Sequence, residues 1–271
     1  MKSPNFFIDT ADCHTIEYIW SKLADKCHPS WVAGITTNPN AMSKVNASNM
    51  IEFEVITRKL CKIVTTIRGD SSGIVYVQHP DSSVSFDELK NWYSVVKQFS
   101  DGHTSVGLKI PPSIHLLQRI SELGEAHINV TGLADCSTAL LCLGYPVRYV
   151  SIIPGRMEEN GINADEHLLF LSKRNTSVRV QEVITGSMRT LDGLRRAIEH
   201  DTVPTIGTKV FDLIFSDGVD NFINYWKYFS NNDNSSISLS PEVNKCMANL
   251  SIAFFNQMDE AGKILKGTLN G

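Results

Sequence analysis

The chain alternates between short apolar runs and longer segments of helical periodicity, from its first residues to about residue 216. The short runs are rich in β-branched and aromatic residues, which is typical of buried strands. Between them, apolar residues recur three and four positions apart, as at Leu89, Trp92, Tyr93, Val96 and Phe99, which predicts helices with one buried face. Eight strands are predicted, at residues 6–9, 31–36, 73–78, 105–110, 127–131, 148–153, 179–184 and 202–206.

Eight strand–helix units in 271 residues fit a single α/β domain, a closed (β/α)8 or TIM barrel, which typically takes about 250 residues. A doubly wound open sheet is the alternative. That fold usually carries a glycine-rich turn after its first strand, whereas the first strand here ends in Asp9-Thr10-Ala11-Asp12. The sequence therefore favours a barrel over residues 1–230.

The remaining residues predict one further element. Residues 231–240 are rich in Asn and Ser, which predicts a polar linker. Val243, Met247, Leu250, Phe254 and Met258 then follow at spacings of three and four, so residues 241–271 are expected to form a C-terminal helix with one apolar face. That face must pack on the barrel or on a neighbouring subunit, and both arrangements remain open.

Composition and charge narrow the class of protein. Lys and Arg total 25 against 29 Asp and Glu, so the chain lacks the overall basic charge with which nucleic-acid-binding domains hold phosphates. No apolar run reaches the roughly 18 residues that a membrane span needs. The N-terminus lacks the apolar stretch of a secretory signal, and the six cysteines show no regular spacing, so we expect a cytoplasmic protein with reduced thiols. The histidines show no metal-ligand spacing, so no metal site is expected.

Polar residues occur at the positions where TIM barrels have their catalytic groups. Catalytic groups in such barrels come from the C-terminal ends of the strands and the loops that follow them. Seven of the eight predicted strands carry polar residues there, namely Asp9, Thr36, Asn38, Gln78, Lys109, Asn129, Thr131, Ser151, Arg156, Ser187 and Arg189.

Lys109 is the sharpest of these candidates. In the strand around it, Val106, Leu108 and Ile110 alternate with Gly107 and Lys109, so the lysine points to the face opposite the three hydrophobic residues. If that face is the barrel interior, loss of water favours the neutral amine, a nucleophile that forms a Schiff base with a carbonyl carbon. A lysine that reaches the rim or pairs with a carboxylate is the alternative.

The other candidates also have two interpretations each. Asp9 either caps the helix that follows, for which Asp12 is better placed, or acts as a general acid and base. Arg156 and Arg189 follow the sixth and seventh strands and either bind a phosphate or form surface ion pairs. The remaining hydroxyls and amides either bind a polyol or a water, or satisfy the backbone.

Seven segments in order resemble the transaldolase family, including its smaller fructose-6-phosphate aldolase branch. The segments are FFIDTAD, AGITTNPN, VYVQHP, VGLKIPPS, INVTGLADCSTALLCLG, YVSIIPGR and VITGSMRT, and the match spans residues 6 to about 215. The resemblance implies a class I aldolase barrel that transfers a dihydroxyacetone unit through a covalent imine, without a metal or organic cofactor. It also implies sugar phosphates as the small-molecule partners and, together with the apolar face of the last helix, a homo-oligomer.

The resemblance also implies a role for each site residue. Lys109 would form the imine, and Asp9 would move the proton of the donor's hydroxyl. Asn38 and Asn129 would hold the polyol, while Thr131 and Gln78 would position the water that carries protons. The phosphate would be bound by Arg156, Arg189 and Ser187, and Ser151 would contact the donor's terminal hydroxyl.

Three functions are compatible with these residues. The favoured one is a transaldolase of the pentose phosphate pathway, which links sedoheptulose 7-phosphate and fructose 6-phosphate with glyceraldehyde 3-phosphate and erythrose 4-phosphate. Gln78 stands where transaldolases carry glutamate and resembles the aldolase branch, which releases free dihydroxyacetone. Ile153 replaces the phenylalanine or tyrosine that separates the two branches. A barrel that binds sugar phosphates without turnover is the third possibility.

Overall fold

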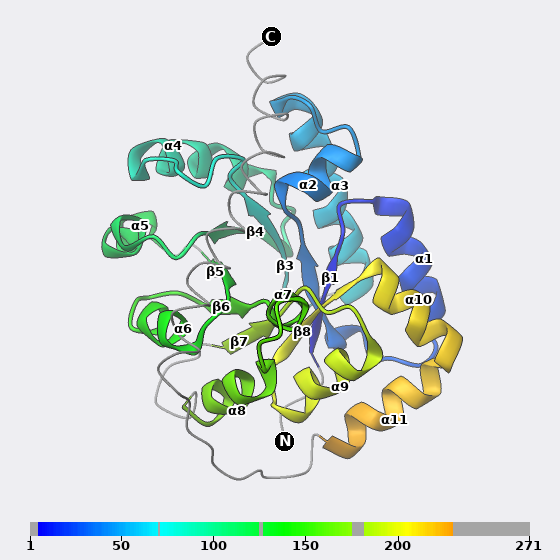
Figure 1. The fold of residues 1–271 in the computed structure, drawn as a ribbon. Helices are drawn as coiled ribbons and strands as arrows, with labels where there is room; N and C mark the ends of the chain where they lie inside the picture. The colour runs from blue at the N-terminus through cyan, green and yellow to red at the C-terminus, as the bar shows by residue number, and fades with distance from the viewer. Residues whose placement is uncertain (1–4, 70, 125–126, 175–181, 230–271) are drawn as a thin grey trace.

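The core of the protein is a closed barrel of eight parallel strands (Figure 1). The computed structural model describes residues 5–69, 71–124, 127–174 and 182–229. In chain order the strands are β1 (Phe6–Asp9), β2 (Val32–Thr36), β3 (Gly73–Gln78), β4 (Thr104–Ile110), β5 (Ile128–Leu133), β6 (Tyr149–Ile152), β7 (Glu182–Thr185) and β8 (Val203–Gly207). Because β8 pairs with β1, the ring closes, which confirms the predicted barrel and excludes the open sheet.

The predicted strands differ from the observed ones mainly at their ends. Strands β1 and β3 have the predicted bounds. Strand β5 continues past Thr131 to Leu133, with a positive φ of 80° at Gly132 and a shift in its register with β6. The predicted strand at 179–184 begins outside the described residues, and β7 is observed from Glu182 to Thr185.

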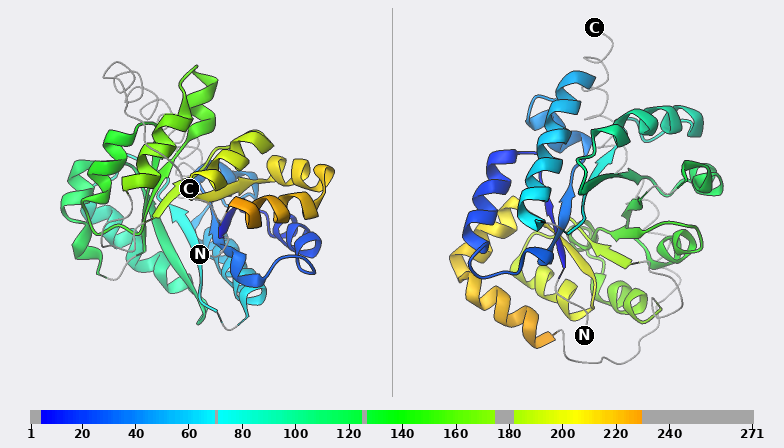
Figure 2. Two further views of the ribbon diagram at one scale, coloured as in Figure 1. Left: turned by 90° about the horizontal axis from the view of Figure 1, so that it is seen from below. Right: turned by 180° about the vertical axis from the view of Figure 1, so that it is seen from behind.

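Helices surround the barrel on the outside of the strands (Figure 2). They are α1 (Cys13–Leu23), α2 (Pro39–Lys44), α3 (Met50–Arg68), α4 (Phe86–Val96), α5 (Ile114–Gln118), α6 (Cys136–Leu143), α7 (Pro154–Glu159), α8 (Ala164–Arg174), α9 (Leu191–Glu199), α10 (Thr208–Asp217) and α11 (Val219–Phe229), with 3₁₀ turns at Pro29–Trp31, Lys97–Phe99 and Ile120–Leu123. Asp12 caps α1, since its Oδ1 accepts from the backbone N–H of His14 at 3.1 Å, as the sequence predicts.

Large side chains fill the N-terminal half of the barrel interior. Phe7, Tyr76 and Tyr149 meet edge to face there, with ring centroids 5.6–5.9 Å apart. Ile184 and Val203 complete this buried cluster. Aromatic pairs in this geometry stabilise a core beyond their buried area. Since these side chains occupy the lower half, the C-terminal half of the interior is left for polar side chains.

The last described helix returns to the first strand. Phe222 and Trp226 of α11 pack on Phe6 of β1, with ring centroids 6.2 and 5.8 Å away. The predicted linker at 231–240 and the predicted helix at 241–271 lie outside the described residues. Within the described ranges, the helices are too short or too polar to cross a membrane.

Candidate active site at the C-terminal end of the barrel

A cavity of about 160 Å³ opens at the C-terminal ends of the strands. The sequence singles out eleven side chains, and this one cavity brings all of them together. They are Asp9, Thr36, Asn38, Gln78, Lys109, Asn129, Thr131, Ser151, Arg156, Ser187 and Arg189. Four further residues line it, Ile153, Ile184, Gly186 and Thr205. Thr205 was not among the candidates, although the alternation along β8 places it on the same face as buried Val203.

Strand register places three of these side chains abreast. Gln78 of β3 pairs with Lys109 of β4, and Lys109 pairs with Asn129 of β5. Neighbouring strands lie about 4.8 Å apart, so the amides of Gln78 and Asn129 flank the lysine at the same height in the barrel. A group that reacts with the lysine therefore meets a hydrogen-bonding amide on each side.

Lys109 lies inside the barrel and not at its rim. The residue is 8% exposed, and its Nζ donates to the backbone carbonyl of Thr37 at 3.1 Å. Burial lowers the pKa of the Lys109 ammonium below its usual value, and the charge of Asp9 opposes this shift without reversing it. A buried amine with a lowered pKa is more often neutral, which is the form that attacks a carbonyl carbon.

Asp9 is held by a threonine on the neighbouring strand. Its register partner on β2 is Thr36, whose Oγ1 donates to Asp9 Oδ1 at 2.7 Å. Because Asp12 caps α1, the carboxylate of Asp9 is not used as the cap and stays in the cavity. Thr36 is 1% exposed, so its main contact is with Asp9, which it orients.

Asn129 and Ser151 form a buried pair. The Ser151 hydroxyl donates to Asn129 Oδ1 at 2.7 Å, and both residues are at least 95% buried. The Asn129 Nδ2 is buried and has no hydrogen-bond partner among the described residues. An unpaired buried donor destabilises a protein unless a ligand or water satisfies it, so this amide is ready to donate to a hydroxyl that enters the cavity.

Asn38 has a structural task that the sequence analysis did not assign. Its Oδ1 accepts from the backbone N–H of Ala41 at 2.9 Å and thereby caps α2. With the oxygen engaged at the cap, the Nδ2 end of the amide is the part that can donate to a bound polyol.

Arg156 and Arg189 both form an ion pair with the carboxylate of Glu159. Arg156 Nη1 lies 3.1 Å from Glu159 Oε2, and Arg189 Nε lies 3.0 Å from Glu159 Oε1. The hydrogen bond from Arg189 lowers the pKa of Glu159, so the carboxylate is ionised. The ion-pair alternative from the sequence is thus observed, whereas phosphate binding by these arginines, which also line the cavity, stays a prediction. Each guanidinium has further N–H groups to offer a phosphate.

A close backbone contact brings these two arginines together. A Cβ on Gly155 would lie 1.8 Å from the carbonyl oxygen of Ser187, so only glycine allows the start of α7 to approach the loop after β7. Ser187 itself has a positive φ of 58°, which a serine adopts at some cost. Backbone strain of this kind is frequent at ligand-binding loops.

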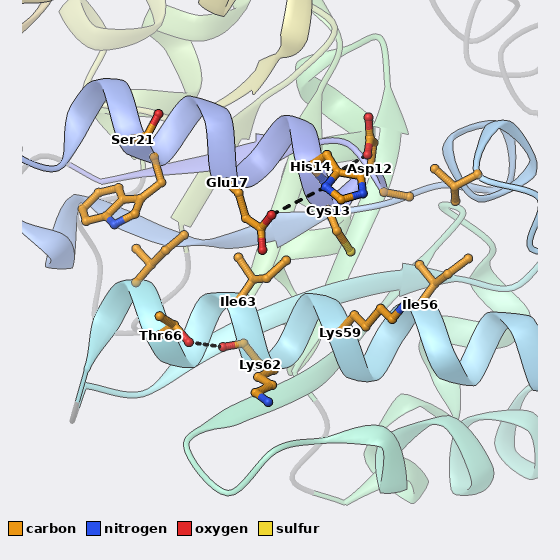
Figure 3. Close-up of a pocket in the computed structure, with 14 residues that line it drawn as sticks. Asp12, Cys13, His14, Glu17, Ser21, Ile56, Lys59, Lys62, Ile63 and Thr66 are labelled. Carbon is orange, nitrogen blue, oxygen red and sulfur yellow. Dashed lines mark hydrogen bonds and ion pairs between the residues drawn. The ribbon is translucent and has the colours of Figure 1, made fainter.

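A larger cavity of about 710 Å³ lies outside the barrel, between α1 and α3 (Figure 3). Its lining is mostly apolar and includes Trp20 and Ile63, with Glu17 and Lys59 among the charged residues. Burial raises the pKa of the Cys13 thiol there, so the thiol is a weak nucleophile. The eleven candidate side chains all lie in the barrel cavity, which is therefore the candidate active site.

The described residues contain no group of three or more His, Cys, Asp or Glu side chains that could hold a metal ion. Around Lys109, the cavity offers an amine, a carboxylate, amides and hydroxyls. These groups can form an imine and move protons.

Curated relatives of this chain carry the name "Probable transaldolase". The protein from Desulfotalea psychrophila is 26% identical over 231 residues, which cover 82% of this chain and 97% of the relative. The protein from Brucella ovis is 26% identical over 196 residues, covering 71% and 79% of the two chains. The protein from Caldicellulosiruptor saccharolyticus is 24% identical over 234 residues, covering 82% and 96%.

Two other comparisons add little. No family model matches the chain. Among solved structures, the tryptophan synthase A-subunit from Pyrococcus furiosus aligns with a TM-score of 0.48 and 9% identity over 82% of this chain and 92% of that one. A likeness this weak carries no statement about function, whereas the relatives above support the transaldolase family.

Proposed function

From the transaldolase family that the motifs and the relatives support, we propose that this protein is a transaldolase that transfers a dihydroxyacetone unit between sugar phosphates through a Schiff base on Lys109. The observation that carries the proposal is the buried lysine, which has a lowered pKa and shares a polar cavity with a carboxylate. The proposed substrates are those expected from the sequence, with fructose 6-phosphate or sedoheptulose 7-phosphate as the donor.

The reaction begins at the donor's ketone. The neutral Nζ of Lys109 attacks the carbonyl carbon, and loss of water from the adduct leaves an imine, which takes a proton from the water of the cavity to become an iminium ion. The Asp9 carboxylate then takes the proton of the hydroxyl on the second carbon beyond the carbonyl carbon. The bond between the first and second carbons beyond the carbonyl carbon breaks, its electron pair moves into the iminium to form an enamine, and the aldehyde half leaves.

The second half of the reaction reverses these steps on a new aldehyde. The enamine carbon attacks the acceptor's carbonyl carbon, Asp9 returns its proton to the new alkoxide, and water hydrolyses the imine to release Lys109. Asn129 and Asn38 donate to the hydroxyls of the bound sugar through their Nδ2 groups. Thr131 and Gln78 position the water that carries protons. The phosphate replaces or joins Glu159 as a partner of Arg156 and Arg189.

One observation favours an aldolase as the second candidate. Gln78 stands directly beside Lys109 in the register, and a glutamine cannot take up a proton as a glutamate does. An enzyme that protonates the enamine and releases dihydroxyacetone differs from a transaldolase only in the fate of that enamine. Free dihydroxyacetone without an added acceptor identifies the aldolase, and a rate that depends on erythrose 4-phosphate identifies the transaldolase.

Borohydride trapping tests the shared mechanism directly. The protein is incubated with fructose 6-phosphate, reduced, digested and examined by mass spectrometry. We expect an adduct on Lys109 and its complete loss in Lys109→Met, with a second lysine of the barrel exterior, Lys62→Met, as the matched control that retains it. An unmodified Lys109 in a protein that still binds the sugar phosphate contradicts catalysis and supports the third candidate, a binding barrel without turnover.

The proposal also includes a metabolic pathway, a cellular location and an oligomeric state. A transaldolase belongs to the pentose phosphate pathway, and a cytoplasmic location and a homo-oligomer follow from the sequence-based expectations. Sedimentation of the full chain measures the oligomeric state, and a monomer contradicts that part of the proposal.

A further inference from the structure

One buried hydroxyl at the cavity has no hydrogen-bond partner in the described part of the chain. Thr205 of β8 is 7% exposed, and its Oγ1 is buried without a hydrogen bond to any described residue. Valine has the same shape and favours strands equally well, whereas a buried hydroxyl without a partner destabilises the fold. Because the side chain lines the cavity, the missing partner can come from a molecule that enters there.

Two glycines lie next to Thr205. Gly207 follows Thr205 on the same face of β8, and a Cβ there would meet no atom within 4 Å. A Cβ on Gly186, after β7, would lie 4.0 Å from the Thr205 Cβ. A side chain at either position would take up space beside Thr205, so the glycines leave room for a ligand next to this residue.

The barrel fixes which part of a substrate can reach Thr205. In the pairing of β8 with β1, Thr205 lies opposite Phe7 and Gly207 opposite Asp9, so Thr205 sits about 7 Å deeper than the carboxylate. Strand β8 stands across the ring of eight strands from β4, which carries Lys109. Arg189 follows the adjacent β7. A ligand attached to Lys109 with its phosphate at the arginines crosses the cavity past Asp9, and Thr205 lies below that path, on the wall of the cavity.

We propose that Thr205 is a further substrate-binding residue, whose hydroxyl hydrogen bonds to a hydroxyl of the aldehyde half of the sugar phosphate. The donor half stays with Lys109, Asn129 and Ser151 on the other side of the cavity. The inference rests on the proposed function, because the two halves are defined by the bond that the enzyme breaks.

The test compares Thr205→Val with Thr205→Ser in two assays. For Thr205→Val, kcat/KM with fructose 6-phosphate should fall roughly tenfold or more, the usual effect of one lost hydrogen bond. Thr205→Ser keeps the hydroxyl and should therefore retain most of the parent kcat/KM. Borohydride trapping of Lys109 with dihydroxyacetone, which has no aldehyde half, should match the parent protein in both variants. Thr185→Val is the matched control, because Thr185 is buried on β7 outside the cavity and bonds to Thr202.

Each contrary result has a distinct meaning. An unchanged kcat/KM in Thr205→Val overturns the inference, as does an equal loss in the valine and serine variants, which indicates packing instead of a hydrogen bond. A matching loss in dihydroxyacetone trapping overturns the assignment to the aldehyde half. If valine prevents folding, Thr205→Ala provides the hydroxyl-free variant. A parent protein that forms no adduct on Lys109 refutes the proposed function itself, and with it the inference.

Discussion

At the scale of single residues, the site contains polar and charged groups whose burial is energetically unfavourable for the fold. The ammonium of Lys109 is buried, and within the described part of the chain the Nδ2 of Asn129 and the Oγ1 of Thr205 have no hydrogen-bond partner. Each of these features weakens the folded state and prepares the residue for a ligand. These residues are therefore expected to lower the free energy of unfolding of the protein, as is common for residues at functional sites.

Lys109→Met should raise the melting temperature at pH 7. Burial lowers the pKa of Lys109, so below that lowered pKa the folded protein carries the full cost of a buried ammonium. The cost declines as pH rises from the lowered pKa towards 10.5, the usual value, because the folded lysine is then neutral while the unfolded one is still charged. Calorimetry of both proteins from pH 7 to 10.5 should show the gain shrinking. A gain that is absent at pH 7 contradicts the burial of a charged lysine.

At the scale of elements, the arginine pair depends on the contact between the start of α7 and the loop after β7. Neither segment carries both guanidinium groups, and Gly155 decides how closely the segments approach. The carboxylate of Glu159 then holds Arg156 and Arg189 at a common point. A backbone contact thus brings together a pair of arginines that neither element carries alone.

Gly155→Ala should weaken phosphate binding and stability together. The new Cβ would lie 1.8 Å from the Ser187 carbonyl oxygen, so the two segments must separate, at a cost of about 1–3 kcal/mol. We expect a raised KM for fructose 6-phosphate and unchanged trapping of dihydroxyacetone on Lys109. Urea unfolding and steady-state kinetics measure both effects. Gly102→Ala is the control, because a Cβ there meets no atom within 4 Å, and equal behaviour of the two variants would refute the role of this contact.

At the scale of the whole molecule, the ring of strands is closed by β1 pairing with β8, and α11 packs on the start of β1. Trp226 lies 5.8 Å from Phe6 of β1 and 6.0 Å from Trp31, which precedes β2, between ring centroids. These contacts join the first strand of the barrel to the last described helix, although the two are far apart in the sequence. The candidate active-site cavity is at the opposite end of the strands from this cluster.

Trp226→Ala should destabilise the fold without altering the site. Removing a buried tryptophan costs about 3–5 kcal/mol, and Trp226 is 5% exposed. Chemical denaturation should show this loss, while kcat and KM at 20 °C or below, where the variant is folded, should match the parent values. Leu141→Ala removes a side chain that is 56% exposed and should change stability by about 0.5 kcal/mol or less. A similar loss in both variants would contradict the importance of the packing of α11 on β1.

The sequence by itself predicted the eight strands, the barrel and the candidate side chains. These depend on local periodicity, since alternation along β4 already sets Lys109 opposite Val106, Leu108 and Ile110. It could not predict that Thr36 orients Asp9, that Ser151 pairs with Asn129, or that Thr205 joins the cavity. The two hydrogen bonds join residues 27 and 22 positions apart on neighbouring strands, and Thr205 lies opposite Phe7 only because β8 pairs with β1 and closes the ring. Tertiary structure alone decided which polar groups were satisfied by the protein and which were left for a ligand.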